Sequence, residues 1–216
     1  MKLRNKNLKI LKSNHVYSEE MEHDACGVGL VASTEGLKSR KVVEYGIDAL
    51  KAVWHRGAID ADGKTGDGAG IHIEIPKDFF EEKIEVTGHK HDNSELCVGM
   101  IFLPRNDYSA QEQCRTIVES ELTKRNFSIY GWRQVPVDPS VLGEKAEQTR
   151  PEITQVLFTY NDKKVVNKSL EQKLYETRRV IEKEALNNQL NNFYICSFSS
   201  KSIIYKGMFL AEALSD

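Results

Sequence analysis

The sequence predicts a mixed α+β fold, because segments with strand character and segments with helix character come in blocks instead of alternating strictly along the chain. At 216 residues, the chain is long enough for one substantial core. Its 40% apolar and 29% charged content is typical of a globular protein. These observations favour packed layers of α and β structure in one principal domain over a doubly wound parallel sheet.

Charge, hydropathy and cysteine spacing narrow the expected partners and compartment. A net charge of −2 lacks the basic excess of a nucleic-acid binder, so nucleic acid is not expected as a partner. No run approaches the roughly 18 uncharged apolar residues of a membrane span, and the N-terminus lacks the apolar region of a secretory signal. Cys26, Cys97, Cys114 and Cys196 are too widely spaced for a disulfide framework or paired zinc ligands. We therefore expect separate thiols in a reducing, cytoplasmic compartment.

Residues 1–25 form a leader in which the charges are split. Its first 12 residues hold five basic and no acidic residues, and residues 13–25 hold four acidic residues and no Lys or Arg. This pattern is typical of a solvated tail, or of a presequence or propeptide that is cleaved off. The basic start leaves an organellar transit peptide open, although the usual enrichment in Arg and Ser is missing.

A strand, a turn and a helix are predicted after the leader. The small apolar run 27–32 predicts a strand buried on both faces, where glycines allow close approach of a neighbouring backbone. A turn at 34–36 follows. Apolar residues then recur at helical spacing from Lys41 to Trp54, which predicts an amphipathic helix that ends near Gly57.

A glycine-rich loop comes next. Five glycines and three aspartates between residues 57 and 70 predict a loop with many positions suited to positive φ. Such a loop can cradle phosphate, but this one leads into an alternating strand, 71–75, and not into the helix that a nucleotide-binding motif needs. The sequence therefore disfavours a nucleotide site here, and Pro76 is expected to end the strand.

The rest of the chain carries further strand and helix signals. In order, they predict a helix at 78–85, a loop at 86–95, a strand at 96–103, a helix from the capping box Ser109–Glu112 to Lys124, a strand at 127–137, a loop at 138–151, a strand at 153–160, a helix from the capping box Ser169–Gln172 to Leu186, and strands at 193–198 and 203–205.

Two expectations concern the end of this series. The last two strands are separated by a short turn, which predicts an antiparallel hairpin. The charged face of the helix before them, which includes Glu171, Arg178 and Glu182, is expected to be a solvated surface.

Cys26 is the strongest candidate nucleophile. Only a thiolate attacks, so a nucleophilic cysteine needs a base. One candidate is a histidine, His55 or His72, with Asp67 to orient it. The other is the α-amino group of Cys26 itself, which cleavage of the Ala25–Cys26 bond would free and whose ordinary pKa is about 7.7 to 8.0. Spacing alone leaves both bases open.

A metal site formed by His89, His91, Asp92 and Cys97 is a weaker candidate. A His-x-His pair can place two imidazoles on one side of a strand, but this segment is polar, loop-like and without a second ligand pair. We expect no metal, with solvent-exposed histidines in a loop. Cys97, Cys114 and Cys196 lie in apolar segments and are expected to be buried structural thiols.

Ordered sequence blocks extend from about residue 22 to 210. They are Glu22-His23-Asp24-Ala25-Cys26-Gly27-Val28-Gly29, His55-Arg56-Gly57-Ala58, the run 60–70, Gly131-Trp132-Arg133, Val135-Pro136-Val137-Asp138, Val141-Leu142-Gly143, Pro151-Glu152-Ile153-Thr154-Gln155 and Ile203-Ile204-Tyr205-Lys206-Gly207-Met208. Together they resemble the class II glutamine amidotransferase domain that begins the large subunit of glutamate synthase.

This resemblance implies a fold and a reaction. The fold is that of the N-terminal nucleophile hydrolases, a four-layer αββα sandwich of which 26–216 would be the front portion, with Cys26 on the first mature strand. The freed α-amino group would be the base, and Cys26 would attack the side-chain amide of glutamine to release ammonia and form a glutamyl thioester that water hydrolyses. Arg56 and Gly57 would support the nucleophile, and the backbone of 65–70, with Asp67 and Gly68, would pack beside it.

The resemblance also implies partners and cofactors outside this chain. The ammonia would pass to a synthase domain that makes glutamate from 2-oxoglutarate. FMN and an iron–sulfur cluster would belong to the other domains of the full-length enzyme, with a small subunit or ferredoxin as a further partner, and this chain itself would hold no cofactor.

One departure from the family pattern affects the expected activity. The family's residues for the glutamine carboxylate and amino group, and its oxyanion hole, come later than the block that ends at Met208. We therefore expect a fragment that is nearly inactive alone, since losing an oxyanion donor costs on the order of 100-fold in rate.

Two alternatives remain open from the residues. One is a non-catalytic module that pairs with another polypeptide. The other is an independent hydrolase with a Cys26–His55 dyad, in which His55→Ala would abolish activity.

Overall fold

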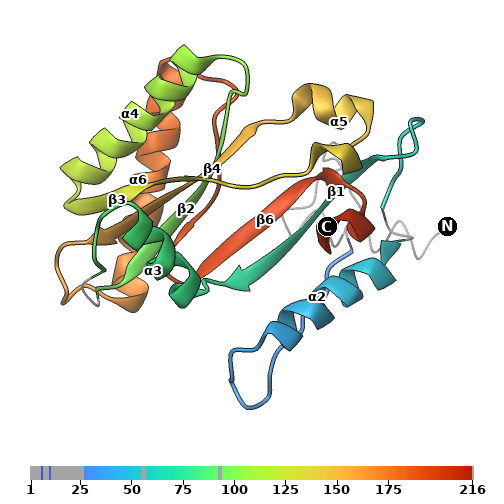
Figure 1. Cartoon of the computed structure of the whole chain (residues 1–216), viewed down its shortest axis with the longest axis horizontal. Coiled ribbons are helices and arrows are strands. Elements are labelled where there is room, and N and C mark those ends of the chain that lie inside the picture. The colour runs from blue at the N-terminus through green and yellow to red at the C-terminus, as the bar shows by residue number, and fades with distance from the viewer. Residues whose placement is uncertain (1–5, 7–9, 11–26, 55–56, 92–93, 216) are drawn as a thin grey trace.

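The computed structural model describes residues 6, 10, 27–54, 57–91 and 94–215, and within them the chain forms two antiparallel sheets with helices packed against them (Figure 1). The helices are α2 (Arg40–Ala52), α3 (Lys77–Val86), α4 (Tyr108–Lys124), α5 (Glu144–Thr149) and α6 (Asn167–Asn187), with short 3-10 turns η2 (Pro139–Val141) and η3 (Ala211–Ser215). The strands are β1 (Thr65–Glu74), β2 (Leu96–Leu103), β3 (Phe127–Gln134), β4 (Glu152–Tyr160), β5 (Tyr194–Ser199) and β6 (Ser202–Phe209).

The larger sheet has the strand order β3-β4-β2-β5, and every neighbouring pair in it is antiparallel. The pairing of β2 with β4 runs without a shift from Leu96 opposite Thr159 to Leu103 opposite Glu152. The smaller sheet joins β1 to β6. This arrangement confirms the predicted mixed α+β class.

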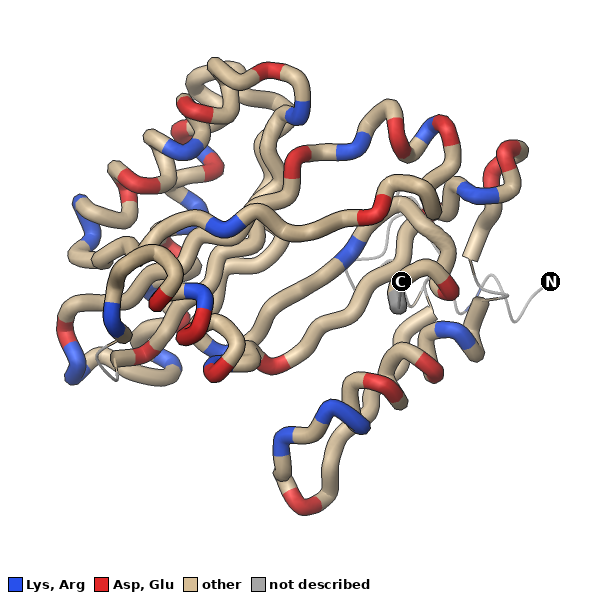
Figure 2. The backbone as a smooth tube through the Cα atoms, in the orientation of Figure 1, with Lys and Arg blue, Asp and Glu red and all other residues tan. Residues whose placement is uncertain are grey.

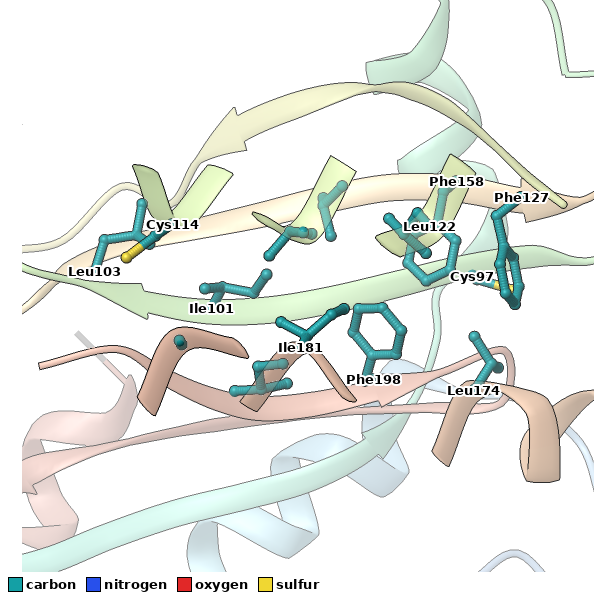
Figure 3. Close-up of a cluster of buried hydrophobic side chains, with 14 of the residues drawn as sticks. Cys97, Ile101, Leu103, Cys114, Leu122, Phe127, Phe158, Leu174, Ile181 and Phe198 are labelled. Atoms are coloured by element: carbon teal, nitrogen blue, oxygen red, sulfur yellow. The ribbon is translucent and has the colours of Figure 1, made fainter. Parts of the chain in front are cut away.

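Two hydrophobic cores lie on opposite faces of the larger sheet. Because side chains alternate along a strand, Cys97 and Ile101 of β2 point into the core beneath α4 and α6, shown in Figure 3, whereas Val98 and Met100 point into the second core. That second core is completed by α3 and by residues of β6. Burial of a side chain of this size stabilises the fold by about 1.5 to 3 kcal/mol relative to exposure, so these cores hold the strands in place.

Several predicted elements are confirmed. Strand β2 has the predicted bounds, 96–103. Helix α6 buries the predicted stripe of Leu170, Leu174, Thr177, Ile181 and Ala185, and the turn at 34–36 closes with a bond from Gly36 N to Ser33 O of 3.2 Å.

The segment 27–32 corrects a prediction. It was expected to be a strand buried on both faces, but it has no strand structure, and Val28 and Leu30 are 90% and 92% exposed. A strand needs a partner for its backbone groups, and the other strands of the described residues pair among themselves without it. The short apolar run therefore does not form a strand by itself here.

The glycine-rich segment is also more regular than predicted. Strand β1 begins at Thr65 and not at residue 71, with an irregularity in its pairing between Thr65 and Ala69. A Cβ atom on Gly66 would lie 2.6 Å from Phe209 O, and one on Gly70 would lie 2.7 Å from Tyr205 O. These glycines let β6 approach closely, which is why a sequence typical of a loop forms a strand.

The predicted hairpin of the last two strands is wrong. Although only a short turn separates them, β5 pairs with β2 and β6 pairs with β1, so the chain passes from one sheet to the other. Glu171 of α6 holds this crossing point, since its carboxylate accepts hydrogen bonds from Ser200 N at 2.8 Å and from Ser199 Oγ at 3.0 Å.

The charged face of α6 is therefore not simply a solvated surface. Besides the contacts of Glu171, Arg178 Nη2 donates to Ile195 O at 2.8 Å while its Nε pairs with Glu182 at 2.7 Å. Charged groups of this helix thus bond to the backbone of β5 and of the turn after it.

Helix starts and one loop differ from prediction as well. Asp107, and not Ser109, caps α4, because its side chain accepts a bond from Ala110 N. Helix α6 begins at Asn167 without a side-chain cap, so the predicted capping box at Ser169 does not form. The predicted loop 138–151 contains the short helices η2 and α5. No helix in the described ranges is both long and apolar enough to cross a membrane.

Candidate functional site

The described part of the candidate site surrounds the start of β1. Cys26, His55 and Arg56 lie outside the described residues, as does Ala25. Gly57, Asp67 and Gly68 are described, and the surroundings of the site are built from them.

Gly57 and Asp67 lie side by side in the structure. Asp67 N donates to Ala58 O at 3.2 Å, which joins the residue after Gly57 to the early part of β1. A Cβ atom on Gly57 would lie 3.4 Å from Asp67 Oδ1. Gly57 N in turn donates to Trp54 O at 3.0 Å, close to the end of α2. The structure therefore places the Asp67 carboxylate next to the residue that follows Arg56.

Residues between Gly57 and Asp67 form a short antiparallel ladder closed by a turn. Ile59 and Gly66 make an antiparallel bridge, and Asp60 N donates to Thr65 O at 2.9 Å. Beyond this pair, Gly63 N donates back to Asp60 O at 2.9 Å. The ladder thus runs from Gly57 and Asp67 at its base to residues 60–65 at its tip.

Asp62 organises the tip of this ladder. Its carboxylate accepts bonds from Thr65 Oγ1 at 2.5 Å, Thr65 N at 2.7 Å and Lys64 N at 2.9 Å. The Thr65 hydroxyl, followed by these backbone N–H groups, lowers the pKa of Asp62 to about 2. Hydrogen bonds to a carboxylate favour its charged form, so Asp62 is ionised at neutral pH.

Gly68 occupies a backbone conformation that favours glycine. Its φ is +119°, and a Cβ atom there would lie 3.6 Å from Gly207 O of β6. Since L side chains rarely adopt this φ, the glycine allows the strand to change its pairing at this point. Helix α2 packs against the same strand, where Gly46 lies near Ile71 Cδ1, and Figure 1 shows α2 alongside β1 and η3.

His72 is not brought to this cluster. It lies on β1 opposite Ile204 and is exposed. The five residue steps from position 67 to position 72 correspond to about 16 Å of extended strand. Among the described residues, Asp67 is therefore not in a position to orient His72.

His89 and His91 flank Tyr130, with ring centroids 6.1 and 5.8 Å from it. His91 is mostly buried and its Nδ1 lies 3.2 Å from Glu81 Oε1, so the expectation of a solvent-exposed histidine is wrong for His91. Asp92 lies outside the described residues. In the part of the chain that the structure describes, no three His, Cys, Asp or Glu side chains gather as metal ligands would.

Cys97, Cys114 and Cys196 are buried thiols, as predicted. Burial raises the pKa of each thiol, that of Cys114 to about 11. Because only a thiolate attacks, these three cysteines are poor nucleophiles at neutral pH.

A partly buried series of hydrogen bonds connects the two sheets and was not predicted. Arg133 Nη1 donates to Gln155 Oε1 at 2.8 Å, and Gln155 Nε2 donates to the Tyr205 hydroxyl at 3.3 Å. Gln155 is a fully buried residue of β4, with Arg133 on the neighbouring β3 and Tyr205 on β6. These three residues come from three of the separate sequence blocks quoted above, and the hydrogen bonds at both ends of the Gln155 amide satisfy its buried polar atoms.

Charge is distributed without a dominant sign over the described chain. Figure 2 shows acidic and basic residues interspersed along the tube, in agreement with the net charge of −2. Several charged residues of the helices form ion pairs with residues three or four positions away, such as Arg40 with Glu44 and Arg115 with Glu112.

Comparison with known proteins identifies the family. The profile of the class II glutamine amidotransferases matches residues 26–216. The chain is 54% identical over 209 residues to the glutamate synthase [NADPH] large chain of Azospirillum brasilense, a match that covers 97% of this chain and 14% of that protein. It is 36% identical over 210 residues to the ferredoxin-dependent glutamate synthase of Pyropia yezoensis, covering 95% of this chain and 13% of the relative.

A third relative is the chloroplastic/mitochondrial ferredoxin-dependent glutamate synthase 1 of Arabidopsis thaliana, which is 38% identical over 195 residues, with 89% of this chain and 12% of the relative covered. The chain thus spans about one seventh of the length of the relatives it matches. With the family profile matched along nearly the whole of it, the chain belongs to the class II glutamine amidotransferases.

Proposed function

We propose that this chain is the glutaminase part of a glutamate synthase, which hydrolyses glutamine through Cys26 and supplies ammonia for the formation of glutamate from 2-oxoglutarate. The observation that carries the proposal is the family match, which begins at Cys26 itself and extends to residue 216. The similarity of 97% of the chain to a glutamate synthase large chain supports the choice of parent enzyme. The match gives no support to a non-catalytic module or an independent Cys-His hydrolase.

Cleavage before Cys26 is part of the proposal. Residues 1–25 are removed as a propeptide, which leaves 26–216 with Cys26 at its N-terminus, and a match that starts at residue 26 supports this boundary. The freed α-amino group then accepts the thiol proton. The thiolate attacks the side-chain carbonyl carbon of glutamine, the carbon–nitrogen bond breaks, and the departing ammonia takes up the proton. Water hydrolyses the resulting thioester to glutamate and restores the thiol.

Four further residues support the nucleophile in this proposal. Arg56 and Gly57 line the nucleophile's surroundings, and Asp67 and Gly68 pack beside them from β1. The 3.4 Å approach of Asp67 Oδ1 to the Cβ position of Gly57 supports this grouping. Gly68, with its positive φ, lies at the irregularity in the pairing of β1 directly after Asp67.

The proposed fold is the front portion of a four-layer αββα sandwich. Its supporting observations are the order of packing, in which α4 and α6 cover one face of the larger sheet, the other face shares a core with β6, and α2 packs on β1.

Partners and cofactors follow from the parent enzyme. Glutamine is the substrate, and the remaining glutamate synthase domains receive the ammonia. FMN and an iron–sulfur cluster are assigned to those remaining domains of the parent enzyme, and Cys97, Cys114 and Cys196, which are buried in hydrophobic cores, are not assigned as cluster ligands. The relatives include an NADPH-type large chain and ferredoxin-dependent enzymes, which favours NADPH or ferredoxin as the source of electrons, and the term large chain favours a small subunit as a further partner. A cytoplasmic location is proposed. An organellar location, like that of the chloroplastic/mitochondrial relative, is the alternative.

The test uses a chimaera, since the chain spans only 14% of the Azospirillum relative. The chain replaces the matching N-terminal part of that large chain, and ammonia release from glutamine is measured. We expect the purified chimaera to begin at Cys26 on N-terminal sequencing, and the Cys26→Ser variant to lose activity by at least about 1000-fold. Glutaminase activity that persists in Cys26→Ser would contradict the proposal.

Histidine variants decide the identity of the base. His55→Ala and His72→Ala are expected to keep activity within about threefold, because the α-amino group serves as the base. Loss of activity in His55→Ala with residues 1–25 still attached would instead establish a Cys26–His55 dyad.

A further inference from the structure

The tip of the ladder at residues 60–65 is seated on a second segment, residues 140–145, which the sequence does not connect with it. Lys145 Nζ pairs with Asp60 Oδ2 at 2.6 Å, and Lys64 Nζ donates to Ser140 O at 3.5 Å. Helix α5, which carries Lys145, lies over the same end of β1 in Figure 1. Two basic side chains, one from each segment, thus join the tip to η2 and to the start of α5.

Gly143 allows residues 140–145 to approach the tip of the ladder closely. A Cβ atom on residue 143 would overlap both Asp62 Oδ2 and Thr65 Oγ1, and would lie 2.5 Å from Thr65 N. Its φ of −77° and ψ of 166° are open to any residue. The absence of a side chain at Gly143 therefore serves the contact with the tip, not a special backbone conformation.

The ladder is short enough that a shift of its tip also displaces its base. It is short, with the pairs Asp60–Thr65, Ile59–Gly66 and Ala58–Asp67 in succession. Three residues of extended chain correspond to about 10 Å. A shift of the tip therefore reaches Gly57 and the Asp67 carboxylate with little intervening structure to absorb it.

We propose that Gly143 and Lys145 are positioning residues, which hold the tip at Asp60, Asp62 and Thr65 and thereby fix Asp67 against Gly57 beside the nucleophile. This inference rests on the proposed function for its catalytic consequence. Neither residue touches the substrate in this proposal; both act through the ladder.

The contacts of Gly143 and Lys145 with the tip of the ladder are called the clamp here. The first experiment tests the clamp without measuring catalysis. Amide hydrogen exchange of Asp67, whose N–H donates to Ala58 O, is followed by NMR in the 216-residue chain. Exchange is expected to accelerate about threefold in Lys145→Met, in which an exposed ion pair is lost, and at least about tenfold in Gly143→Ala. Lys145→Arg should retain the wild-type rate, because it keeps the charge.

Lys124→Met is the matched control. Lys124 pairs with Glu121 at 2.7 Å on α4 and is similarly exposed, but it lies far along the chain from the ladder. It should leave the exchange of Asp67 unchanged. Equal exchange rates for Asp67 in wild type, Lys145→Met and Gly143→Ala would overturn the clamp.

The second experiment tests the catalytic consequence in the glutamate synthase chimaera. Gly143→Ala is expected to lower kcat for glutamine hydrolysis about tenfold with KM changed less than about twofold, since a small misplacement of the nucleophile's surroundings affects the chemical step. Lys145→Met should lower kcat about two- to threefold, and Lys145→Arg should restore it. Faster Asp67 exchange together with an unchanged kcat would reduce the clamp to a structural contact and overturn the positioning role.

The two proposals fail in different ways. Full activity in Cys26→Ser, or no glutaminase activity in the wild-type chimaera, contradicts the proposed function, while the exchange rates of Asp67 still decide whether the clamp exists. If Gly143→Ala does not fold, the exposed Lys145→Met and Lys145→Arg variants decide both measurements.

Discussion

Replacing Glu171 with alanine is expected to destabilise the fold by about 3 kcal/mol. The carboxylate accepts bonds from Ser200 N and Ser200 Oγ, both at 2.8 Å, and from Ser199 Oγ at 3.0 Å. The two hydroxyl groups can turn to other partners, but the N–H of Ser200, a residue 4% exposed, loses its acceptor. An unpaired buried N–H costs about 1 to 3 kcal/mol, and the lost charge-assisted bonds to the hydroxyls add the remainder.

Urea denaturation of the chain, followed by circular dichroism, measures this loss. With a slope of about 2 kcal/mol per M, the midpoint should fall by about 1.5 M in Glu171→Ala. Glu171→Gln keeps one acceptor oxygen, so its urea midpoint should fall by less than that of Glu171→Ala. Glu176→Ala is the control, since Glu176 is exposed on the same helix and bonds only to the Gln172 side chain in the described structure. If Glu171→Ala loses no more stability than Glu176→Ala, the carboxylate does not hold the crossing point between the sheets.

Three further outcomes follow from the described residues. Gly99→Val should lower the free energy of unfolding by about 1 to 3 kcal/mol, because a Cβ atom there lies 2.7 Å from Phe198 Cδ2, and an unchanged Tm would contradict this overpacking. Cys114 should resist iodoacetamide in the native protein at about pH 8 and react only after unfolding, since burial raises its pKa to about 11; mass spectrometry of the peptide checks this. Asp62 should titrate near 2 and not near 3.8 when its carboxyl carbon is followed by NMR, because Thr65 stabilises the ionised form. Since the folded-state pKa is the lower one, the stabilisation by Asp62 is present above about 4 and is lost as the pH falls toward 2; a midpoint near 3.8 would contradict the Thr65 contact.

Periodicity in the sequence predicts the elements whose burial is uniform along their length. The apolar run of β2 and the stripe of α6 are both confirmed, because an eight-residue continuous apolar run and a long stripe at helical spacing are the clearest of the periodic signals. The helix signal near 41–54 likewise yields α2, Arg40–Ala52. Boundaries that depend on a cap, such as Asp107 at the start of α4, need the actual backbone geometry.

Some features of the candidate site could likewise be predicted from the sequence, and others could not. Sequence blocks predict Cys26, Arg56, Gly57, Asp67 and Gly68 as a group, and the structure brings Gly57 and Asp67 together. The contact of Gly143 with the ladder tip could not be predicted from composition or period. It joins segments about 80 residues apart in the sequence, and only its inclusion in a block of family resemblance signals it.

By itself the sequence determined the α+β class, the main helices and strands, and membership of the class II glutamine amidotransferases. These depend on local period and on side-chain identity. Tertiary structure alone decided that β5 and β6 enter different sheets, that glycines 66 and 70 lie within a strand, and that Glu171 bonds to the turn at Ser200. Each of these outcomes depends on which distant backbone or polar group is close enough to pair when the sheets pack. The local sequence does not specify which distant group that will be.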